Sequence, residues 1–306
     1  MKLTIGSRGS QLALWQSEWA KAKLASVNPD LEIEVQVIKT TGDANLAASF
    51  SEIGSKGVFT KEVDAALLAG ETDFSVHSLK DLPTTLPDGL SLTAVSPRED
   101  VRDALCSDGR VLSELPEGAR VATSSLRRQA LLRSMRADIE LLPLRGNVDT
   151  RLRKLTEDDR LDAIVLAAAG LRRLGLERNL TEALDPGAFT PAAAQGVMGI
   201  VSRTGDQTTN DLLQALEDAS SRAAVTAERT ALGELGGGCK IPFGAWARVV
   251  EGGFVLDGVV AHPETGHLVR ASIEGDEGEA EEMGKSLAEV LKQNGADHIL
   301  REVLDA

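Results

Sequence analysis

Residues 120–135 read RVATSSLRRQALLRSM, and this stretch decides the fold class. A short apolar strand, Arg120 to Ala122, passes through small polar residues into a helical pattern from Ser125 to Met135. Strands alternating with helices predict a parallel sheet with crossover helices. The same alternation continues downstream as a strand from Glu140 to Leu144, a helix from Val148 to Leu155 and a strand from Ala163 to Leu166.

The first hundred residues show the same rhythm. Leu3 to Ile5 is a strand candidate, and after it Leu12, Trp15, Trp19 and Ala22 recur at spacings that predict the apolar face of a helix. Further elements are expected as a half-buried strand over Leu31 to Val37, a helix near Thr60 to Ala69, and strands at Phe74 to Val76 and Leu92 to Val95.

Two turn-rich segments, Ser96 to Asp100 and Asp185 to Pro191, are typical of crossings between domains. After about residue 218 the pattern changes to an α+β arrangement. Its expected elements are a helix over Ala223 to Leu235, strands around Ala245 to Val250, Phe254 to Val260 and Leu268 to Ile273, and a helix from Ala280 to Leu304 interrupted at Asn294-Gly295.

The sequence therefore predicts an α/β protein with two lobes that contain mainly parallel sheets, followed by a small C-terminal α+β domain. Two such lobes would leave a cleft at the carboxyl ends of their strands, where open sheets bind ligands. The expected bounds are residues 1–96 and 197–215 for lobe 1, 101–190 for lobe 2 and 218–306 for the C-terminal domain.

The composition limits the possible partners. The 306 residues are 42% hydrophobic and carry a formal net charge of −14, which excludes a general nucleic-acid binder and disfavours an anionic membrane surface. The longest apolar run, Ala163 to Leu171, is too short to span a bilayer, and the N-terminus lacks the apolar stretch of a secretory signal. The two cysteines give no disulfide framework. We expect a cytoplasmic protein and a monomer.

Charge is distributed unevenly along the chain. Between Arg120 and Leu180, twelve arginines and one lysine face eight acidic residues, so this segment has a net charge of +5 and the remainder of the chain −19. An arginine-rich segment inside an acidic protein indicates a confined site for a small anion.

Three strand-to-helix junctions combine arginine with small polar residues. They are residues 5–10, residues 122–128, and residues 144–147 with Arg151. Each helix start offers unpaired backbone N–H groups and the positive end of a dipole. Taken singly, the simpler interpretation is that Ser10 and Ser125 cap their helices and the arginines form a solvated face. Three occurrences together favour anion binding.

A Lys80-Asp81 pair follows directly after a buried strand. An aspartate beside a cation could stay ionised there and act as an acid, a base or the partner of a developing positive charge. A surface ion pair of little energetic value is the open alternative. His77 is expected to be a hydrogen-bonded core residue, and no metal site is expected because no second ligand lies at metal spacing.

Cys239 follows three glycines and precedes Lys240, which would favour its thiolate, although a buried inert thiol is the default. Cys106 is assigned no role. The polar stretch from Gly42 lacks the glycine spacing of a phosphate loop, and we interpret it as a mobile flap over the cleft that includes Lys56 and Phe59.

Together these segments resemble the porphobilinogen deaminase family, whose members are also called hydroxymethylbilane synthases. The resemblance spans nearly the whole chain in order, and only the acidic C-terminal region contributes little to it. The segments that carry it are residues 7–10, 12–16, 76–83, 123–129, 144–148 and 237–239.

The resemblance implies two lobes like those of periplasmic binding proteins, joined by two crossings that act as hinges. It also implies an enzyme of tetrapyrrole and haem biosynthesis, which condenses four porphobilinogen molecules head to tail with loss of ammonia. The growing chain is built on a dipyrromethane cofactor and released by water as hydroxymethylbilane. Cys239 matches the cysteine that holds the cofactor by a thioether bond. Asp81 matches the catalytic aspartate, which is expected to stabilise the cationic azafulvene formed on deamination.

Other positions match residues expected to bind the acetate and propionate groups of cofactor and substrate. They are Arg8, Ser10, Gln16, Lys80, Thr123, Ser125, Arg127, Arg128, Arg145, Gly146, Arg151, Arg172 and Gln195. Three positions depart from the family pattern: Glu52 stands where a basic residue is expected, Ile200 to Arg203 lacks an acidic residue, and Gly236 replaces an acidic one.

The same residues are compatible with two other functions. A non-catalytic binding protein for a small dicarboxylate or phosphate could use the same lobes and arginines, but it would have no use for Cys239 or for Lys80-Asp81. An enzyme that uses Cys239 as an ordinary nucleophile would need a histidine base. The four histidines, His77, His262, His267 and His298, lie in unpromising contexts.

Overall fold

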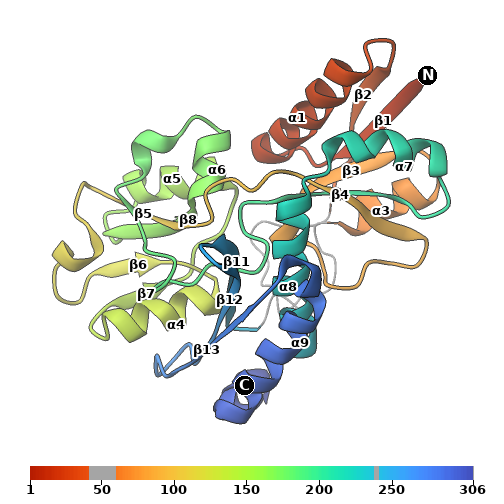
Figure 1. Cartoon of the computed structure of the whole chain (residues 1–306). Coiled ribbons are helices and arrows are strands. Elements are labelled where there is room, and N and C mark those ends of the chain that lie inside the picture. The colour runs from red at the N-terminus through yellow and green to blue at the C-terminus, as the bar shows by residue number, and fades with distance from the viewer. Residues whose placement is uncertain (41–59, 238–240, 306) are drawn as a thin grey trace. The chain divides into compact units, whose positions relative to one another are not determined.

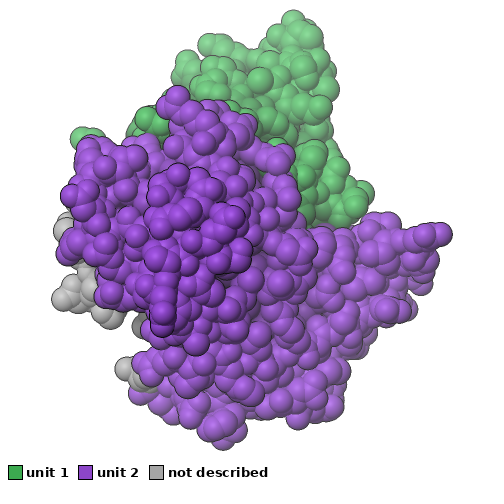
Figure 2. Space-filling view, turned by 90° about the vertical axis from the view of Figure 1, so that its left-hand side faces the viewer, with its two compact units in different colours: residues 1–99, 197–222 green, residues 100–196, 223–306 purple. Residues whose placement is uncertain are grey.

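The computed structural model describes residues 1–40, 60–237 and 241–305. The chain forms two compact units, coloured separately in Figure 2. Unit 1 comprises residues 1–99 and 197–222, and unit 2 comprises residues 100–196 and 223–306. Unit 1 contains one sheet and unit 2 contains two, and each unit has its own buried core.

Unit 1 is built on a five-stranded sheet in the order β2-β1-β3-β10-β4 (Figure 1). β1 pairs in parallel with β2 and β3, while β10 pairs antiparallel with β3 and β4, so four strands share one direction. The strands are β1 (Lys2–Ser7), β2 (Glu32–Val37), β3 (Phe74–Ser78), β4 (Leu90–Val95) and β10 (Met198–Arg203). The longer helices are α1 (Gln11–Val27), α3 (Lys61–Leu68) and α7 (Gln207–Leu213).

The buried face of α1 differs from the predicted one. Ala13, Ser17, Ala20 and Leu24 are buried, whereas Trp15 is 36% exposed and Ala22 is also exposed. Small side chains let the helix lie close to the sheet. Of the predicted residues, Trp19 lies at the margin of this face, where it is half-buried and packs against the same core. The stripe predicted from hydrophobic spacing was therefore wrong by one residue in register.

Strand β2 is only partly the half-buried strand that was expected. Ile33 is buried and Val35 half-buried, but Val37 is 54% exposed. β2 is the edge strand of its sheet, so its end has a neighbour on one side only.

The first part of unit 2 contains a second five-stranded sheet in the order β7-β6-β8-β5-β9. Here β6 is parallel to β7 and β8, and β5 runs antiparallel to β8 and β9. The strands are β5 (Asp103–Ser107), β6 (Arg120–Ala122), β7 (Glu140–Leu142), β8 (Ala163–Ala167) and β9 (Glu182–Ala183). The helices are α4 (Leu126–Met135), α5 (Val148–Glu157) and α6 (Ala168–Arg173).

The two sheets share one plan: three adjacent parallel strands, then one opposed strand, then an edge strand that returns to the common direction. This confirms the predicted mainly parallel α/β lobes. The opposed strands β5 and β10 were not predicted. Both enter from segments that cross between the units instead of from a crossover helix, so the strand-helix alternation gives no signal for them.

The C-terminal part of unit 2 is the expected α+β domain (Figure 1). An antiparallel meander packs against α9, which contacts both β12 and β13. The elements are α8 (Ala219–Glu234), which begins in unit 1, β11 (Phe243–Val250), β12 (Gly253–Ala261), β13 (Leu268–Gly275), α9 (Ala280–Leu291) and α10 (Asp297–Asp305). The predicted interruption at Asn294-Gly295 is confirmed, because Gly295 has a φ of 104° between α9 and α10.

In the described parts of the chain, every helix is too short or too polar to cross a lipid bilayer.

Candidate functional site

In unit 1, the predicted site residues lie where β1 and β3 end side by side in the sheet. The register pairs Gly6 with Ser75, so the residues that follow Ser7 and Ser78 come from neighbouring strands at one edge. The Ser10 hydroxyl caps α1 by accepting a hydrogen bond from the Ala13 N–H at 3.3 Å. The capping role considered for this serine is therefore confirmed.

Gln16 ties α1 to the end of β3. Its side chain is 2% exposed, and its Nε2 donates to the hydroxyl oxygen of Ser78 at 2.8 Å. This contact fixes the helix beside the short helical turn Leu79–Asp81, which carries Lys80 and Asp81.

The Lys80-Asp81 turn is held by its apolar neighbours. Leu79 is fully buried, its backbone N–H donates to the Val197 carbonyl at 2.9 Å, and Leu82 is 4% exposed. Between these anchors Lys80 is half-buried and the Asp81 side chain is exposed. The carboxyl group of Asp81 therefore stands on a fixed backbone and remains accessible to a ligand.

His77 lies on β3 just before this turn and is 8% exposed, with its Nε2 2.9 Å from the Ser75 hydroxyl. Burial, and to a smaller extent the positive charge of Arg8, lower the pKa of His77 to about 4. The imidazole is therefore neutral at neutral pH, which confirms the prediction of a hydrogen-bonded core residue.

In unit 2, the junction between β6 and α4 is a tight polar turn. The Ser125 hydroxyl accepts from the Arg128 N–H at 3.4 Å and caps the helix, and the Ser125 N–H donates to the Thr123 hydroxyl at 3.2 Å. Ser124 bonds to both backbone groups of Leu144, which joins this turn to the end of β7. The capping role of Ser125 is confirmed.

Arg127 and Arg128 do not form the solvated face considered as an alternative. They are 4% and 6% exposed and flank the carboxyl group of Asp103, which is fully buried. Arg128 donates from Nε and Nη2 to Asp103 Oδ1 at 2.9 and 2.6 Å, and from Nη1 to the Val165 carbonyl. Arg127 Nη1 lies 2.8 Å from Asp103 Oδ2 and donates to the Thr190 carbonyl at 2.7 Å.

This cluster buries more positive than negative charge, since one carboxylate faces two guanidinium groups. Arg127 also lies over the ring of Phe189, with its Cζ 5.9 Å from the centroid. Within the described residues, the Nε and Nη2 atoms of Arg127 donate no hydrogen bond. A buried guanidinium with an unused donor edge is suited to binding a carboxylate.

Gln195 belongs to the same cluster. Its side chain is fully buried and donates from Nε2 to the Val101 carbonyl at 2.8 Å and to Asp103 Oδ1 at 3.1 Å. Gln195 therefore contacts Asp103, whose carboxylate also pairs with Arg127 and Arg128.

The third junction follows β7. Gly146 has a φ of 112°, and a Cβ atom placed there would lie 2.7 Å from the Thr150 methyl carbon, so the turn requires glycine. The Gly146 carbonyl accepts a hydrogen bond from Arg151 Nε at 2.7 Å, and both Arg145 and Arg151 are half-buried. This bond holds the Arg151 side chain at the start of α5, to which Arg145 is adjacent in sequence.

Arg172 lies near the end of α6 and pairs with Asp100, with Nη2 and Oδ2 2.8 Å apart. Arg102 forms two further hydrogen bonds to the same carboxyl group, at 2.9 and 2.7 Å. The hydrogen bonds from Arg102 hold the pKa of Asp100 below its usual value. As at Asp103, two arginines share one aspartate.

Asp100 and Asp103 are the site residues that sequence reasoning missed. Asp103 begins a buried strand that continues as Ala104, Leu105 and Cys106. An aspartate at the start of such an apolar run must have a cationic partner, because an unpaired buried charge is very costly. That signal was present in the sequence and could have directed attention to the arginines.

Three predicted residues, Lys56, Phe59 and Cys239, lie outside the described residues, as does Glu52. The other cysteine, Cys106, is fully buried, and burial raises the pKa of its thiol to about 12. That thiol is therefore unreactive at neutral pH.

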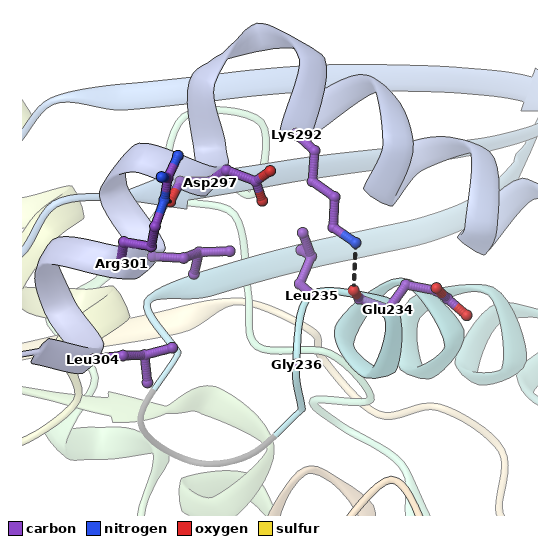
Figure 3. A pocket seen from close by; sticks show the side chains of 8 residues that line it. Glu234, Leu235, Gly236, Lys292, Asp297, Arg301 and Leu304 are labelled. Carbon is purple, nitrogen blue, oxygen red and sulfur yellow. Dashed lines mark hydrogen bonds between the residues drawn. The ribbon is translucent and has the colours of Figure 1, made fainter.

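A hollow of ≈ 560 Å³ lies at the end of α8 (Figure 3). Leu235, Leu300 and Leu304 form its apolar wall, and the Lys292 ammonium donates to the Glu234 carbonyl at 2.7 Å. Acidic and basic side chains are equal in number here, so the hollow does not reproduce the positive charge found around Asp103.

The structure thus gathers the predicted residues into two sets, one in each unit. Arg8, Ser10, Gln16, Lys80 and Asp81 share one edge of the first sheet. The corresponding edge of the second sheet carries Thr123, Ser125, Arg127, Arg128, Arg145, Gly146, Arg151, Arg172 and Gln195. Both sets lie at carboxyl ends of parallel strands, the usual ligand-binding edge of an open sheet.

The sequence matches two family models. Residues 3–211 match "Porphobilinogen deaminase, dipyromethane cofactor binding domain", and residues 222–293 match "Porphobilinogen deaminase, C-terminal domain". Together they extend over most of the chain.

Curated relatives match over nearly the full length. A porphobilinogen deaminase of Syntrophotalea carbinolica is 46% identical over 299 residues, which is 97% of this chain and 95% of the relative. Porphobilinogen deaminases of Syntrophobacter fumaroxidans and Chromobacterium violaceum are also 46% identical, each with 99% of this chain and 98% of the relative covered.

Solved structures with a similar fold include the methionine binding protein MetQ, with a TM-score of 0.44 and 16% identity over 70% of this chain and 89% of that one. A nutrient binding protein from Burkholderia cenocepacia bound to methionine has a TM-score of 0.43 and 14% identity over 70% of this chain and 91% of that one.

The family models and the full-length relatives confirm the family expected from the sequence, together with its enzymatic character and its dipyrromethane cofactor. They also outweigh the two other functions considered, because neither a simple binding protein nor an enzyme with a nucleophilic cysteine and histidine base belongs to this family. The chain is a member of the porphobilinogen deaminase family.

Proposed function

We propose that this chain condenses four porphobilinogen molecules head to tail into hydroxymethylbilane, with Asp81 as the catalytic carboxylate and Cys239 as the attachment point of the cofactor. The observation that carries the binding part of this proposal is the edge of the buried Arg127 guanidinium, Nε and Nη2, that donates no hydrogen bond to any residue the structure describes. Each pyrrole unit brings two carboxylates, so the protein must hold an increasingly negative chain.

The residues of unit 2 fit a dipyrromethane with its four carboxylates. The buried cluster of Arg127, Arg128 and Asp103 has an excess of one positive charge, which an incoming carboxylate would neutralise. Arg145, Arg151 and Arg172 are more accessible and would bind further carboxylates in a forked geometry. When bound through Cys239, the cofactor supplies the terminal pyrrole to which new units are joined.

In this proposal, Asp81 acts on a pyrrole that reaches the edge of the first sheet. Its exposed carboxylate, on a turn anchored by Leu79 and Leu82, can accept a pyrrole N–H and stabilise the positive charge that develops as ammonia leaves. The same carboxylate can take up the proton released after carbon–carbon bond formation. Lys80 and Arg8 would hold the acidic side chains of that ring and keep it in register.

We further propose the three-domain division at residues 1–96 with 197–215, 101–190 and 218–306, and a flap that includes Lys56 and Phe59. Hinge motion at the two crossings would let one set of groups serve successive rings. Porphobilinogen would be taken up by a cytoplasmic monomer that needs neither a nucleic acid nor a membrane partner. The net charge of −14 supports the absence of polyanionic partners.

Intact-protein mass spectrometry tests the cofactor assignment. The protein purified from cells that make porphobilinogen should carry the added mass of one dipyrromethane, and Cys239→Ser should abolish it. Cys106→Ser is the matched control and should retain the adduct, because the Cys106 thiol is buried and unreactive. A bare sequence mass in active protein, or an adduct that survives Cys239→Ser, would overturn the assignment.

A further inference from the structure

The ten residues 187–196, here called the strap, are held by side chains and backbone of the C-terminal part of unit 2. Arg270 on β13 donates to the carbonyls of Gly187 and Ala188 at 2.9 and 2.5 Å, and the Ala245 N–H on β11 donates to the Pro191 carbonyl at 2.9 Å. Gly244 lacks a side chain where the strap passes, since a Cβ there would lie 2.7 Å from the Thr190 carbonyl. The strap is therefore fixed by the C-terminal elements.

Glu228 on α8 makes the most deeply buried of these contacts. Its side chain is fully buried, Oε2 accepts the Ala194 N–H at 2.6 Å, and Oε1 accepts the Ala247 N–H of β11 at 2.8 Å. A carboxylate inside a protein core is costly unless specific groups solvate it. These two amide donors meet that requirement in part and link the strap to the sheet.

The residue that Glu228 holds has an unusual backbone. Ala194 has a φ of 62°, and within the described residues it is the single residue other than glycine with a positive φ. An alanine in the left-handed region is strained and persists when its surroundings hold it there. The bond from Glu228 to the Ala194 N–H is such a restraint.

The next residue, Gln195, links the backbone of Ala194 to the arginine cluster. Its Nε2 donates to Asp103 Oδ1, and the same oxygen accepts two hydrogen bonds from Arg128. On the strap itself, the Thr190 carbonyl accepts from Arg127 Nη1. A change in the Ala194 backbone would therefore displace the amide of Gln195 and alter the carboxylate that orients both guanidinium groups.

We propose that Glu228 is a positioning residue for the Arg127 and Arg128 pair, acting through the strained backbone of Ala194 and the side chain of Gln195. The proposal rests on the proposed function only in that these arginines bind the carboxylates of cofactor and substrate. The relay of contacts joins the helix that precedes Cys239 in sequence to the arginine cluster, all within unit 2.

The Nε–H groups of arginine give a direct readout of the relay without any turnover. In isotope-labelled protein, Glu228→Gln should displace the Nε–H resonance of Arg128, because one oxygen acceptor is replaced by an NH₂ group. Adding Ala194→Gly should return that resonance toward the position seen with Ala194→Gly alone. Glycine adopts a φ of 62° without the hydrogen bond to Glu228. Loss of the Ala247 contact cannot be repaired in this way.

Ala288→Gly on α9 is the control for a general loss of C-terminal packing. Ala288 is 1% exposed in the same apolar core, and its methyl group takes part in none of the hydrogen bonds of the relay. This change should lower the melting temperature while leaving the Arg128 resonance in place. If Glu228→Gln does not fold, Gln195→Met removes the link without placing a new amide in the core, and it should also displace the Arg128 resonance.

The kinetic prediction is a rise in KM for porphobilinogen. Glu228→Gln should raise KM about tenfold, and in the Ala194→Gly background the same change should raise it less than about threefold. Unmoved Arg128 resonances in Glu228→Gln or in Gln195→Met, or a displacement that Ala194→Gly fails to reduce, would overturn the relay. Displaced and rescued resonances with unchanged KM would uphold the relay and instead contradict the proposed ligand role of the arginines.

Discussion

Asp103 Oδ1 accepts two hydrogen bonds from Arg128, at 2.9 and 2.6 Å, in an interior where Asp103 is fully buried and Arg128 is 6% exposed. With Arg127 on the other oxygen, the aspartate neutralises one of two buried positive charges. The excess charge suits an anionic ligand, and it also makes the stability of the fold depend on the aspartate.

Asp103→Asn should therefore destabilise the protein by about 3–5 kcal/mol, because it leaves two buried guanidinium groups without a counter-charge. Chemical denaturation measures this change. Asp138→Asn is the matched control: its partner Arg136 is near the surface, so this change should lower the free energy of unfolding much less. Equal losses for the two variants would show that the Asp103 cluster is not a buried-charge site.

Arg127→Leu should raise KM for porphobilinogen by roughly 10- to 100-fold, since it removes the donor edge proposed to bind a carboxylate. Its stability should fall less than that of Asp103→Asn, because the Asp103 and Arg128 pair left behind is neutral. Arg133→Leu, on the same helix outside the cluster, should leave KM near the wild-type value. Steady-state kinetics decide the matter, and an unchanged KM for Arg127→Leu would refute the assignment.

Gly146→Ala should lower kcat/KM roughly tenfold, because the new methyl group meets Thr150 and displaces the helix start that presents Arg151. Gly109→Ala offers a close comparison, since Gly109 has a φ of 111° but open space around it. Both variants carry the cost of a positive φ, and only the first carries the clash. Equal kcat/KM values for Gly146→Ala and Gly109→Ala would contradict this role of the Gly146 turn.

The buried imidazole of His77 should make the free energy of unfolding fall at acid pH. Its pKa is lowered to about 4 in the fold, from an ordinary value near 6.5, so the unfolded chain binds a proton more readily. The contribution of the neutral His77 to the free energy of unfolding is fully present above about pH 6.5. It falls by about 3 kcal/mol as the pH is lowered toward 4. Unfolding free energies of wild type and His77→Gln between pH 7 and 4 should converge as the pH falls. Parallel curves would contradict the buried neutral imidazole.

The sequence predicted those parts of the fold that depend on local signals. Helix α4 begins after Ser125 as expected, because a capping serine and an apolar repeat lie next to each other in the chain. Strand β5 and its Asp103 were missed, since their partners lie far away in sequence. The wrong face predicted for α1 has another origin: hydrophobicity ranks tryptophan above alanine, but space beside the sheet favours the smaller residue.

The candidate site divides in the same way. Arg127, Arg128, Arg145 and Arg151 could be located because each follows a strand-to-helix junction. What the sequence could not give is the burial of the first two or the roles of Gln195 and Glu228, which arise from contacts across unit 2. Such contacts depend on packing between distant segments.

The central claim is that Asp81 carries the chemistry, and the rate of hydroxymethylbilane formation by Asp81→Asn tests it most directly. Asp81 is exposed, so the variant should fold with a free energy of unfolding within about 0.5 kcal/mol of wild type. Its kcat should fall by about 10²–10³, because a neutral amide cannot stabilise the developing positive charge. Asp88→Asn, another exposed aspartate of unit 1, should retain nearly full activity. A folded Asp81→Asn enzyme that turns over within about threefold of the wild-type rate would contradict the claim.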